Sequence, residues 1–304
     1  MSILVTFNPI SGAGKAERLA SEIRDEARVA GLDLEVRETS PGPAADWLRP
    51  VLAGREALVV VGGDGAIRRA APEAALADVP LVHCPAGNEN LFARDFGMTA
   101  EPTEVVSTLR RDHRHRVDLV RVEMPDRPPE VVVLMASFGL DAEVVHDLDA
   151  RRTGGVSNLS YVLPIARQLL AYEAPVISAR IDGRVVAERV PAFGLVANSP
   201  QYAGRLDPVR SARIDDGLLH LMLFPGRGRF GLMRWFARVG LGRHEEHPNL
   251  VRASGRRVEL TLADARRWQV DGDPPDDGAP VDRIAFEIQP GALPVLLPAR
   301  DATV

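Results

Sequence analysis

The most constraining feature of the sequence is an apolar strand that stops in a glycine-rich turn. Residues 57–61 are all apolar and lead directly into Gly-Gly-Asp-Gly at 62–65. Glycines at such a corner permit positive φ and let the backbone approach a ligand closely. Their N–H groups can face a polyphosphate, and the aspartate can meet the metal ion that accompanies a nucleotide. The turn therefore predicts a nucleotide site of a phosphoryl-transfer enzyme, with an ordinary strand-to-turn corner as the alternative.

Length and composition indicate a globular protein of two domains. The chain has 304 residues, of which 45% are hydrophobic and 26% charged. No apolar run approaches the roughly 20 residues that span a bilayer, and the N-terminus predicts a first strand rather than a signal peptide. The single cysteine, Cys84, excludes an intramolecular disulfide and favours a reducing compartment, so the expected location is cytoplasmic. A net charge of −5 argues against a general nucleic-acid binder.

The first third of the chain alternates strands with helices. This rhythm predicts a parallel sheet with right-handed crossovers, in which ligands bind beyond the carboxyl ends of the strands. The turns at 8–15, 62–65 and 85–90 all follow strands and are expected to converge there. His83 and Cys84 end a buried strand and are interpreted as core. The predicted strands are 3–7, 32–38, 57–61 and 81–84, and the predicted helices are 16–30, 44–53 and 66–76.

From about residue 117 the rhythm changes to short strands with turn signals at close spacing, which predicts an antiparallel sandwich. The expected architecture is an α/β nucleotide-binding domain at 1–117 followed by a β-sandwich at 118–304, with the return of the extreme C-terminus to the first domain left open. Two helices are expected, at 159–172 and 229–241. The predicted strands are 117–122, 131–137, 177–181, 193–197, 218–223, 257–262, 266–270 and 283–288.

An ordered series of motifs resembles the diacylglycerol kinase catalytic family, which includes bacterial lipid kinases and the sphingosine and ceramide kinases. Gly-Gly-Asp-Gly is similar to the nucleotide motif that this family shares with phosphofructokinases and NAD kinases. The resemblance covers nearly the whole chain. The other matching segments are Asn-Pro-x-Ser-Gly at 8–12, Pro-x-Gly-x-x-Asn-x-Phe-Ala-Arg at 85–94, Asp-Leu at 118–119, Ser-x-Gly-x-Asp-Ala at 137–142, the stretch from Asn198 through Asp-Gly at 216–217, and Asp-Gly-Asp at 271–273.

The resemblance implies an ATP- and Mg²⁺-dependent lipid kinase of phospholipid metabolism that phosphorylates the hydroxyl group of diacylglycerol or a related lipid. Asp64 would serve the nucleotide and its metal, and Asp273 would be the general base. Thr39 matches a nucleotide-contacting threonine of the family, and Asn88 replaces the other such threonine. The full set of implied nucleotide contacts is Asn8, Ser11, Gly12, Thr39, Gly62, Gly63, Asp64, Gly65, Ala66, Ile67, Arg68 and Asn88.

The resemblance also implies a structural Mg²⁺ site in the loop around Asp216. The ligands would be the backbone carbonyls of Arg213 and Leu218 and the carboxylate of Asp216, with Asp118 in support. Oxygen-only ligands from one tight loop suit a hard cation. A bare hairpin turn at this position is the alternative.

Several positions depart from the family pattern. Ala66 replaces a threonine, Arg68 and Arg69 replace an Asn-Glu pair, Leu91 replaces an aspartate, and Asp273 replaces a glutamate. These changes keep three alternatives open: a kinase for a sphingoid base, a kinase for a soluble hydroxylated metabolite, and a non-catalytic nucleotide- or lipid-binding relative.

The segment 227–243 interleaves arginines with Phe, Leu, Met and Trp. On a helix this composition fits either a membrane interface, which would make the protein peripheral at the inner membrane face, or a helix packed on the sandwich with its arginines in water. The oligomeric state is left open, with a homodimer as one alternative.

Overall fold

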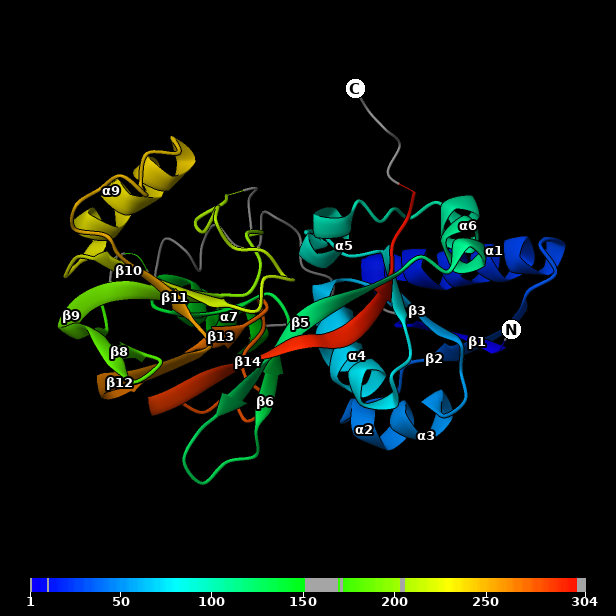
Figure 1. The fold of residues 1–304 in the computed structure, drawn as a ribbon, viewed down its shortest axis with the longest axis horizontal. Helices are drawn as coiled ribbons and strands as arrows, with labels where there is room; N and C mark the ends of the chain where they lie inside the picture. Colours follow the sequence, from blue (N-terminus) through cyan, green and yellow to red (C-terminus); the bar gives the residue numbers. More distant parts are fainter. Residues whose placement is uncertain (1, 10, 151–168, 170–171, 203–205, 300–304) are drawn as a thin grey trace. The chain divides into compact units, whose positions relative to one another are not determined.

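The computed structural model describes residues 2–9, 11–150, 169, 172–202 and 206–299 (Figure 1). The chain divides into two compact units, Met1–Val117 with Gly291–Val304, and Asp118–Pro290. Most of the predicted helix at 159–172 lies outside the described residues.

The first unit is built on a parallel sheet, as predicted. Its strands run in the order β2-β1-β3-β4, and the C-terminal part of β14 adds beside β4 through Val295 and Leu81. Both β1 and β3 are almost entirely buried and apolar, as expected for strands covered on both faces. The strand bounds are β1 Ser2–Phe7, β2 Asp33–Glu38, β3 Ala57–Gly62, β4 Leu81–Pro85 and β14 Val281–Leu296.

Helices cover both faces of this sheet, with α1 and α6 on one side and α2 to α4 on the other (Figure 1). The predicted single helix at 44–53 is wrong: it is two short helices, because Pro50 has no N–H with which to continue the helical ladder. The helices α5 and α6 were not predicted. The helix bounds are η1 Ser11–Gly14, α1 Lys15–Val29, α2 Ala44–Trp47, α3 Arg49–Leu52, α4 Asp64–Ala77, α5 Leu91–Phe96 and α6 Pro102–Arg111.

The second unit is an antiparallel β-sandwich, which confirms the predicted fold class. The long strand β9 belongs to both sheets, since its first half pairs with β8 and its second half with β7 and β10. Trp268, Phe138 and Phe286 are fully buried between the sheets. The other strand bounds are β5 Arg114–Glu123, β6 Glu130–Val132, β7 Met135–Phe138, β8 Val176–Ile181, β9 Arg184–Ala197, β10 Leu219–Pro225, β11 Val251–Gly255, β12 Arg257–Arg266 and β13 Gln269–Val270.

Two predicted strands of this unit are wrong in extent. The strand expected at 131–137 is divided into β6 and β7, because the N–H groups of residues 133–135 turn to the carboxylate of Asp271 instead of a neighbouring strand. Of the strand expected at 266–270, only the last two residues form β13, and Arg266 instead ends β12. Strand β11 and the first half of β9 were not predicted.

The outer face of the sheet that contains β7, β9 and β10 is covered by helices α7 (Leu140–Ala150) and α9 (Arg229–Gly240). Their apolar residues form a core of their own with Phe193 and Phe224. None of the helices in the described part of the chain is both long and apolar enough to cross a membrane.

Candidate functional site

The Gly-Gly-Asp-Gly turn carries β3 directly into α4. Asp64 opens the helix, and the residue before it, Gly63, provides no side-chain cap. The first N–H groups of a helix have no partner within it, and with the helix dipole they favour an anion. Beside them, Oδ1 of Asp64 accepts a hydrogen bond from the backbone N–H of Phe92 at 3.1 Å. The turn thus combines amide donors for phosphate with an anchored carboxylate of the kind that Mg²⁺ prefers.

This turn lies against the loop that follows β4. A Cβ atom on Gly87 would come within 2.7 Å of the Cα atom of Gly63, so only glycine lets the two backbones touch. The Gly62 carbonyl accepts the Ala86 N–H at 2.8 Å. Asn90, at φ 51°, closes the loop: its Nδ2 donates to the Gly87 carbonyl at 2.8 Å, and its Oδ1 accepts the Gly87 N–H at 2.9 Å.

The turn after β1 joins the same edge of the sheet. A Cβ atom on Gly12, whose φ is 60°, would lie 2.6 Å from the Ala86 carbonyl oxygen. The Ser11 N–H donates to the Asn8 carbonyl at 2.9 Å, and the Thr39 N–H donates to the last residue of β1 at 2.9 Å. The turns after β1, β3 and β4 therefore converge, as the parallel topology predicts, with Thr39 close to the end of β1.

The remaining predicted nucleotide contacts differ in exposure. The Ile67 side chain is buried in the core, so only its backbone is available to a nucleotide. Arg68 is half-buried, whereas Asn88 is exposed. Ala66 leaves no room for a side chain at position 62, because a Cβ atom on Gly62 would lie 2.6 Å from the Cβ atom of that alanine.

His83 supports the glycine turn, although the sequence indicated only a core residue. The ring is fully buried, and its Nε2 lies 2.9 Å from the Gly62 carbonyl oxygen. A carbonyl only accepts, so Nε2 carries the proton and donates it. Burial lowers the pKa of His83 and keeps the ring neutral. The available signal was a lone polar residue near the end of an otherwise apolar strand.

In the second unit, the Asp-Gly-Asp turn at 271–273 is held at several points. The carboxylate of Asp271 accepts three successive backbone N–H groups, those of residues 133–135, at 2.7 to 3.0 Å. Gly272 donates its N–H to Oε1 of Gln269 at 2.8 Å. Asp273 exchanges backbone hydrogen bonds of 2.9 Å with Val270, and its side chain is half-buried. Sequence reasoning singled out Asp273 and missed the anchoring role of Asp271.

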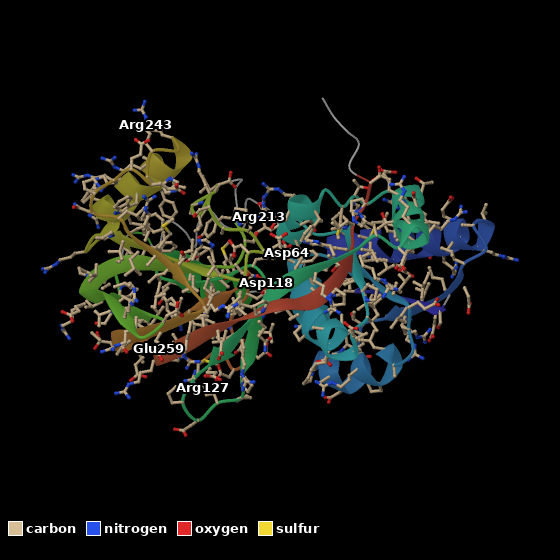
Figure 2. The ribbon with its side chains drawn as sticks, viewed as in Figure 1. Asp64, Asp118, Arg127, Arg213, Arg243 and Glu259 are labelled. Atoms are coloured by element: carbon tan, nitrogen blue, oxygen red, sulfur yellow. The ribbon has the colours of Figure 1, made fainter. Side chains whose placement is uncertain are left out.

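The loop predicted to hold Mg²⁺ folds around the carboxylate of Asp216. That carboxylate accepts the N–H groups of Arg213 at 3.2 Å and Leu218 at 2.9 Å, and it lies 3.0 Å from Nε2 of His220. Asp118 accepts the Gly217 N–H at 2.7 Å, which fastens the loop to β5. Arg213 and Asp118 are labelled in Figure 2.

This loop fits a hard cation. A carboxylate offers about four acceptor positions, so three donors leave capacity on Asp216. The carbonyl oxygens of Arg213, which accepts the Asp216 N–H at 3.3 Å, and of Leu218 would complete an all-oxygen donor set of the kind that Mg²⁺ takes. Among the described residues, no three His, Cys, Asp or Glu side chains gather in a metal-binding group, so a cation here would depend on backbone oxygens.

A polar cluster around Asp141 lies next to the Asp-Gly-Asp turn. Tyr202 donates to Oδ2 of Asp141 at 2.8 Å, and Ser137 donates to the same oxygen. Gln269, whose Oε1 holds Gly272, donates from Nε2 to Ser137 at 2.8 Å. Burial raises the pKa of Asp141, and these hydrogen bonds oppose the rise. The Ser-x-Gly-x-Asp motif thus ties α7 to β13, the strand that leads into the Asp-Gly-Asp turn.

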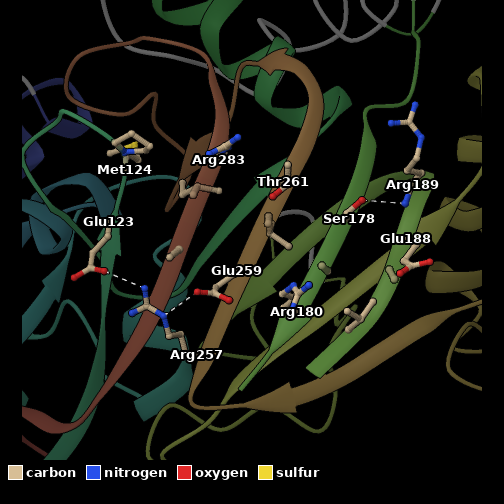
Figure 3. A pocket seen from close by; sticks show the side chains of 17 residues that line it. Glu123, Met124, Ser178, Arg180, Glu188, Arg189, Arg257, Glu259, Thr261 and Arg283 are labelled. Carbon is tan, nitrogen blue, oxygen red and sulfur yellow. Dashed lines mark hydrogen bonds and ion pairs between the residues drawn. The ribbon is translucent and has the colours of Figure 1, made fainter. Parts of the chain in front are cut away.

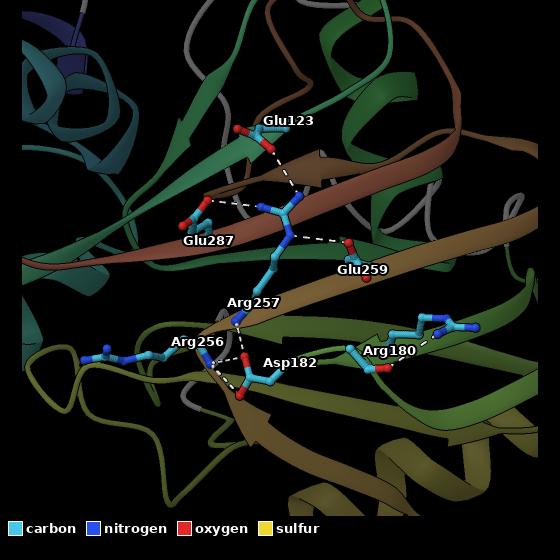
Figure 4. Close-up of polar contacts among 8 residues, drawn as sticks. Glu123, Arg180, Asp182, Arg256, Arg257, Glu259 and Glu287 are labelled. Atoms are coloured by element: carbon cyan, nitrogen blue, oxygen red, sulfur yellow. Dashed lines mark hydrogen bonds and ion pairs between the residues drawn. The ribbon is translucent and has the colours of Figure 1, made fainter.

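The sandwich also carries an open groove of about 710 Å³ over β8, β9, β12 and β14 (Figure 3). Its polar lining includes Arg180, Arg257, Glu259, Thr261 and Arg283. None of the predicted site residues lines it. The guanidinium group of Arg257 in this groove is enclosed by carboxylates, with Glu123, Glu259 and Glu287 at 3.1 to 3.3 Å (Figure 4).

The chain thus combines a parallel α/β unit, in which three turns converge at one edge of the sheet, with a β-sandwich. The family model of the diacylglycerol kinase catalytic domain matches residues 2–122. The model of the YegS C-terminal NAD kinase beta sandwich-like domain matches residues 134–297. The chain therefore belongs to the diacylglycerol kinase and YegS family of lipid kinases.

Individual relatives agree with this assignment. A protein named diacylglycerol kinase from Mycobacterium tuberculosis (strain H37Rv) is 29% identical over 248 residues, which cover 79% of this chain and 78% of the relative. A protein named "Probable lipid kinase YegS-like" from Pseudomonas fluorescens is 28% identical over 291 residues, covering 93% of this chain and 92% of the relative.

Two solved structures share the fold. A diacylglycerol kinase structure from Bacillus anthracis str. Sterne superimposes with a TM-score of 0.74 at 18% identity, covering 97% of this chain and 96% of that chain. Yeast NADH kinase complexed with NADH gives a TM-score of 0.54 at 12% identity, covering 99% of this chain and 84% of that chain. The second likeness confirms the predicted relation to the NAD kinase fold.

Proposed function

We propose that this lipid kinase transfers the γ-phosphate of ATP, in a Mg²⁺-dependent reaction, to the hydroxyl group of diacylglycerol or a closely related lipid. The observation that carries the proposal is the start of α4, where uncapped amides and Asp64 lie against the glycine loop after β4. The name of the mycobacterial relative supports diacylglycerol as the acceptor.

The first unit would bind the nucleotide. Phosphoryl transfer requires neutralisation of phosphate charge and in-line positioning of the acceptor. The amides of the turn at 62–65 would face the phosphates, and Asp64 would hold the metal ion, which supplies charge neutralisation when it is bound. Arg68, in the first turns of α4, adds a guanidinium group suited to phosphate oxygens. The turn after β1 and Thr39 would contact the rest of the nucleotide.

Asp273 would act as the general base that accepts the proton of the lipid hydroxyl. A base must be held in a fixed position, because a displacement of about 1 Å can lower the rate roughly 10²-fold. The turn that carries Asp273 has this restraint, since Asp271 and Gln269 anchor the residues before it and Asp273 exchanges two backbone hydrogen bonds with Val270. The loop at 213–218 would hold a structural Mg²⁺ through Arg213, Asp216 and Leu218, with Asp118 fastening the loop.

The test is transfer of labelled phosphate from ATP, with Mg²⁺, to diacylglycerol, monoacylglycerol and sphingoid bases in mixed micelles. Asp64→Ala and Asp273→Asn are assayed beside the wild type, and Asp282→Asn, an exposed position on β14, is the control. We expect labelled diacylglycerol from the wild type and the control, and none from the two variants.

Each other outcome is informative. If the sphingoid base is labelled and diacylglycerol is not, the acceptor is the sphingoid base and the proposed mechanism still holds. Full activity in Asp273→Asn would remove Asp273 from the role of base. Absence of any labelled lipid, with ATP still bound, would overturn the proposal.

A further inference from the structure

Helix α9 packs one side against the sandwich, and this side contains part of the apolar set that the sequence offered as membrane contacts. Leu232, Trp235 and Val239 are buried in the core with Phe224. The indole Nε1 of Trp235 donates to the Pro225 carbonyl at 2.8 Å. These three side chains therefore hold α9 on the sheet and are not available to a bilayer.

The opposite side of α9 is apolar where a water-facing helix would be polar. Phe230 is 67% exposed, Met233 50% and Leu241 72%. They are three of the six large hydrophobic residues that are exposed in the described part of the chain. At 3.6 residues per turn, Phe230 and Leu241 project within about 20° of each other and Met233 about 60° away. The exposed apolar side chains thus form one stripe along the helix.

Arginines flank this stripe. The segment 227–243 contains five arginines and no acidic residue, although the whole chain has a net charge of −5. All five are exposed, and Figure 2 shows Arg243 extending away from the ribbon. The guanidinium carbon of Arg229 lies 5.1 Å from the ring centre of Phe230. We call this surface the outer face of α9; it comprises Phe230, Met233, Leu241, Arg227, Arg229, Arg234, Arg238 and Arg243.

We propose that the outer face of α9 docks on a lipid bilayer that contains anionic lipids. An apolar stripe bordered by arginines matches an interfacial helix, in which the stripe enters the acyl boundary and the guanidinium groups meet the headgroups. Charge complementarity favours this occupant over a second copy of the chain. A two-fold contact through this face would place the same five arginines against themselves, and no carboxylate of the segment could offset them.

The test is co-sedimentation with vesicles, which needs no kinase activity and so stands apart from the proposed reaction. The probes are vesicles of phosphatidylcholine alone and of phosphatidylcholine mixed with phosphatidylglycerol. We expect the wild type to bind the mixed vesicles and to be released by high salt, because the Debye length then falls to a few ångströms. Binding to phosphatidylcholine alone should be at least tenfold weaker.

Two pairs of variants separate the stripe from the arginines. Phe230→Ser/Leu241→Ser should weaken binding at least tenfold, while Leu76→Ser/Val185→Ser, which removes two exposed apolar side chains elsewhere, should not. Arg234→Glu/Arg238→Glu should abolish the preference for phosphatidylglycerol. Its control, Arg110→Glu/Arg111→Glu, makes the same charge change on exposed positions of α6 and should leave binding unchanged.

A tryptophan at the stripe gives a second readout that does not depend on loss of binding. Phe230→Trp should show a blue-shifted emission with the mixed vesicles and quenching by brominated lipid. Equal binding by the wild type and Phe230→Ser/Leu241→Ser would overturn the proposal. So would self-association in solution that Phe230→Ser/Leu241→Ser abolishes, since a second copy of the chain would then be the occupant.

Discussion

Gly63 and Gly87 meet backbone to backbone. A Cβ atom on Gly87 would lie 2.7 Å from the Cα atom of Gly63 and 3.0 Å from Oδ1 of Asn90. This contact joins the turn after β3 to the loop after β4, and it brings Asp64 within hydrogen-bond reach of Phe92. The candidate nucleotide site therefore depends on two glycines that are 24 positions apart in the sequence.

Gly87→Ala should loosen this contact. The added methyl group meets backbone atoms that cannot rotate away, so we expect a loss of about 1–3 kcal/mol in the free energy of unfolding. Separation of the two loops should also weaken ATP binding at least tenfold, because binding depends on their spacing. Urea unfolding and ATP titration measure the two effects. Gly240→Ala is the matched control, since a Cβ atom there has no neighbour within 4 Å.

Asp64→Asn and Asp64→Ala should separate the structural and chemical roles of this residue. Asn keeps an acceptor for the Phe92 N–H, whereas Ala removes it, so only Ala should lower stability, by about 1 kcal/mol. Both variants lose the negative charge that would hold a metal ion, and we expect kcat to fall at least 10²-fold in each. Phosphate transfer at saturating ATP and thermal unfolding are the measurements. Normal kcat in Asp64→Asn would contradict the assignment.

Asp271 and Asp273 should behave differently despite being two residues apart. Asp271→Ala leaves three buried N–H groups without an acceptor and should lower the free energy of unfolding by about 3 kcal/mol or more. Asp271→Asn keeps one acceptor oxygen and tolerates the positive φ of 52°, so its loss should be smaller. Asp273→Asn should lose activity with little change in stability. Urea unfolding measures these three losses of stability, with Asp282→Ala as the control.

The stability of the protein should fall as the pH drops below about 6.5, in part because of His83. Burial lowers its pKa in the folded state, so below the unfolded pKa the proton binds to the unfolded chain and not to the folded one. The expected slope is up to about 1.4 kcal/mol per pH unit until the folded pKa is reached, and the effect is absent above about pH 6.5. Carboxylates also contribute to the loss of stability in acid, so a variant that lacks His83 is needed to isolate the contribution of this residue.

His83→Gln is that variant. Glutamine can donate from Nε2 to the Gly62 carbonyl but does not titrate. Its unfolding free energy should depend less steeply on pH between about 6.5 and 5 than that of the wild type. Identical slopes for the two proteins would show that His83 is not protonated on unfolding in this range.

Much of the first unit could be predicted from the sequence, because its signals are local. The apolar runs of β1 and β3 and the spacing of Leu19, Ile23 and Ala27 on α1 each show their period within a few residues. The parallel sheet follows from the order of these elements, and the convergence of the glycine turns follows from the sheet. Pro50, which has no N–H, is also the local signal that divides the helix expected at 44–53 into α2 and α3.

The second unit shows the limit of the same reasoning. Nothing near residues 133–135 indicates that their N–H groups leave the ladder, because the acceptor is Asp271, more than 130 positions away. Likewise, the composition of α9 predicted an amphipathic helix but not which side faces the sheet, and Trp235 is on the buried side.

The sequence by itself determined the fold class, the family motifs and the residues that carry charge at the candidate site, since these depend on residue type and short-range spacing. Tertiary structure alone decided what those residues contact. The burial of His83 beneath the glycine turn, the capture of three amides by Asp271 and the exposure of Phe230 and Leu241 arise from segments brought together by packing. Long-range packing depends on how complementary surfaces fit, and no local pattern of residues records that fit.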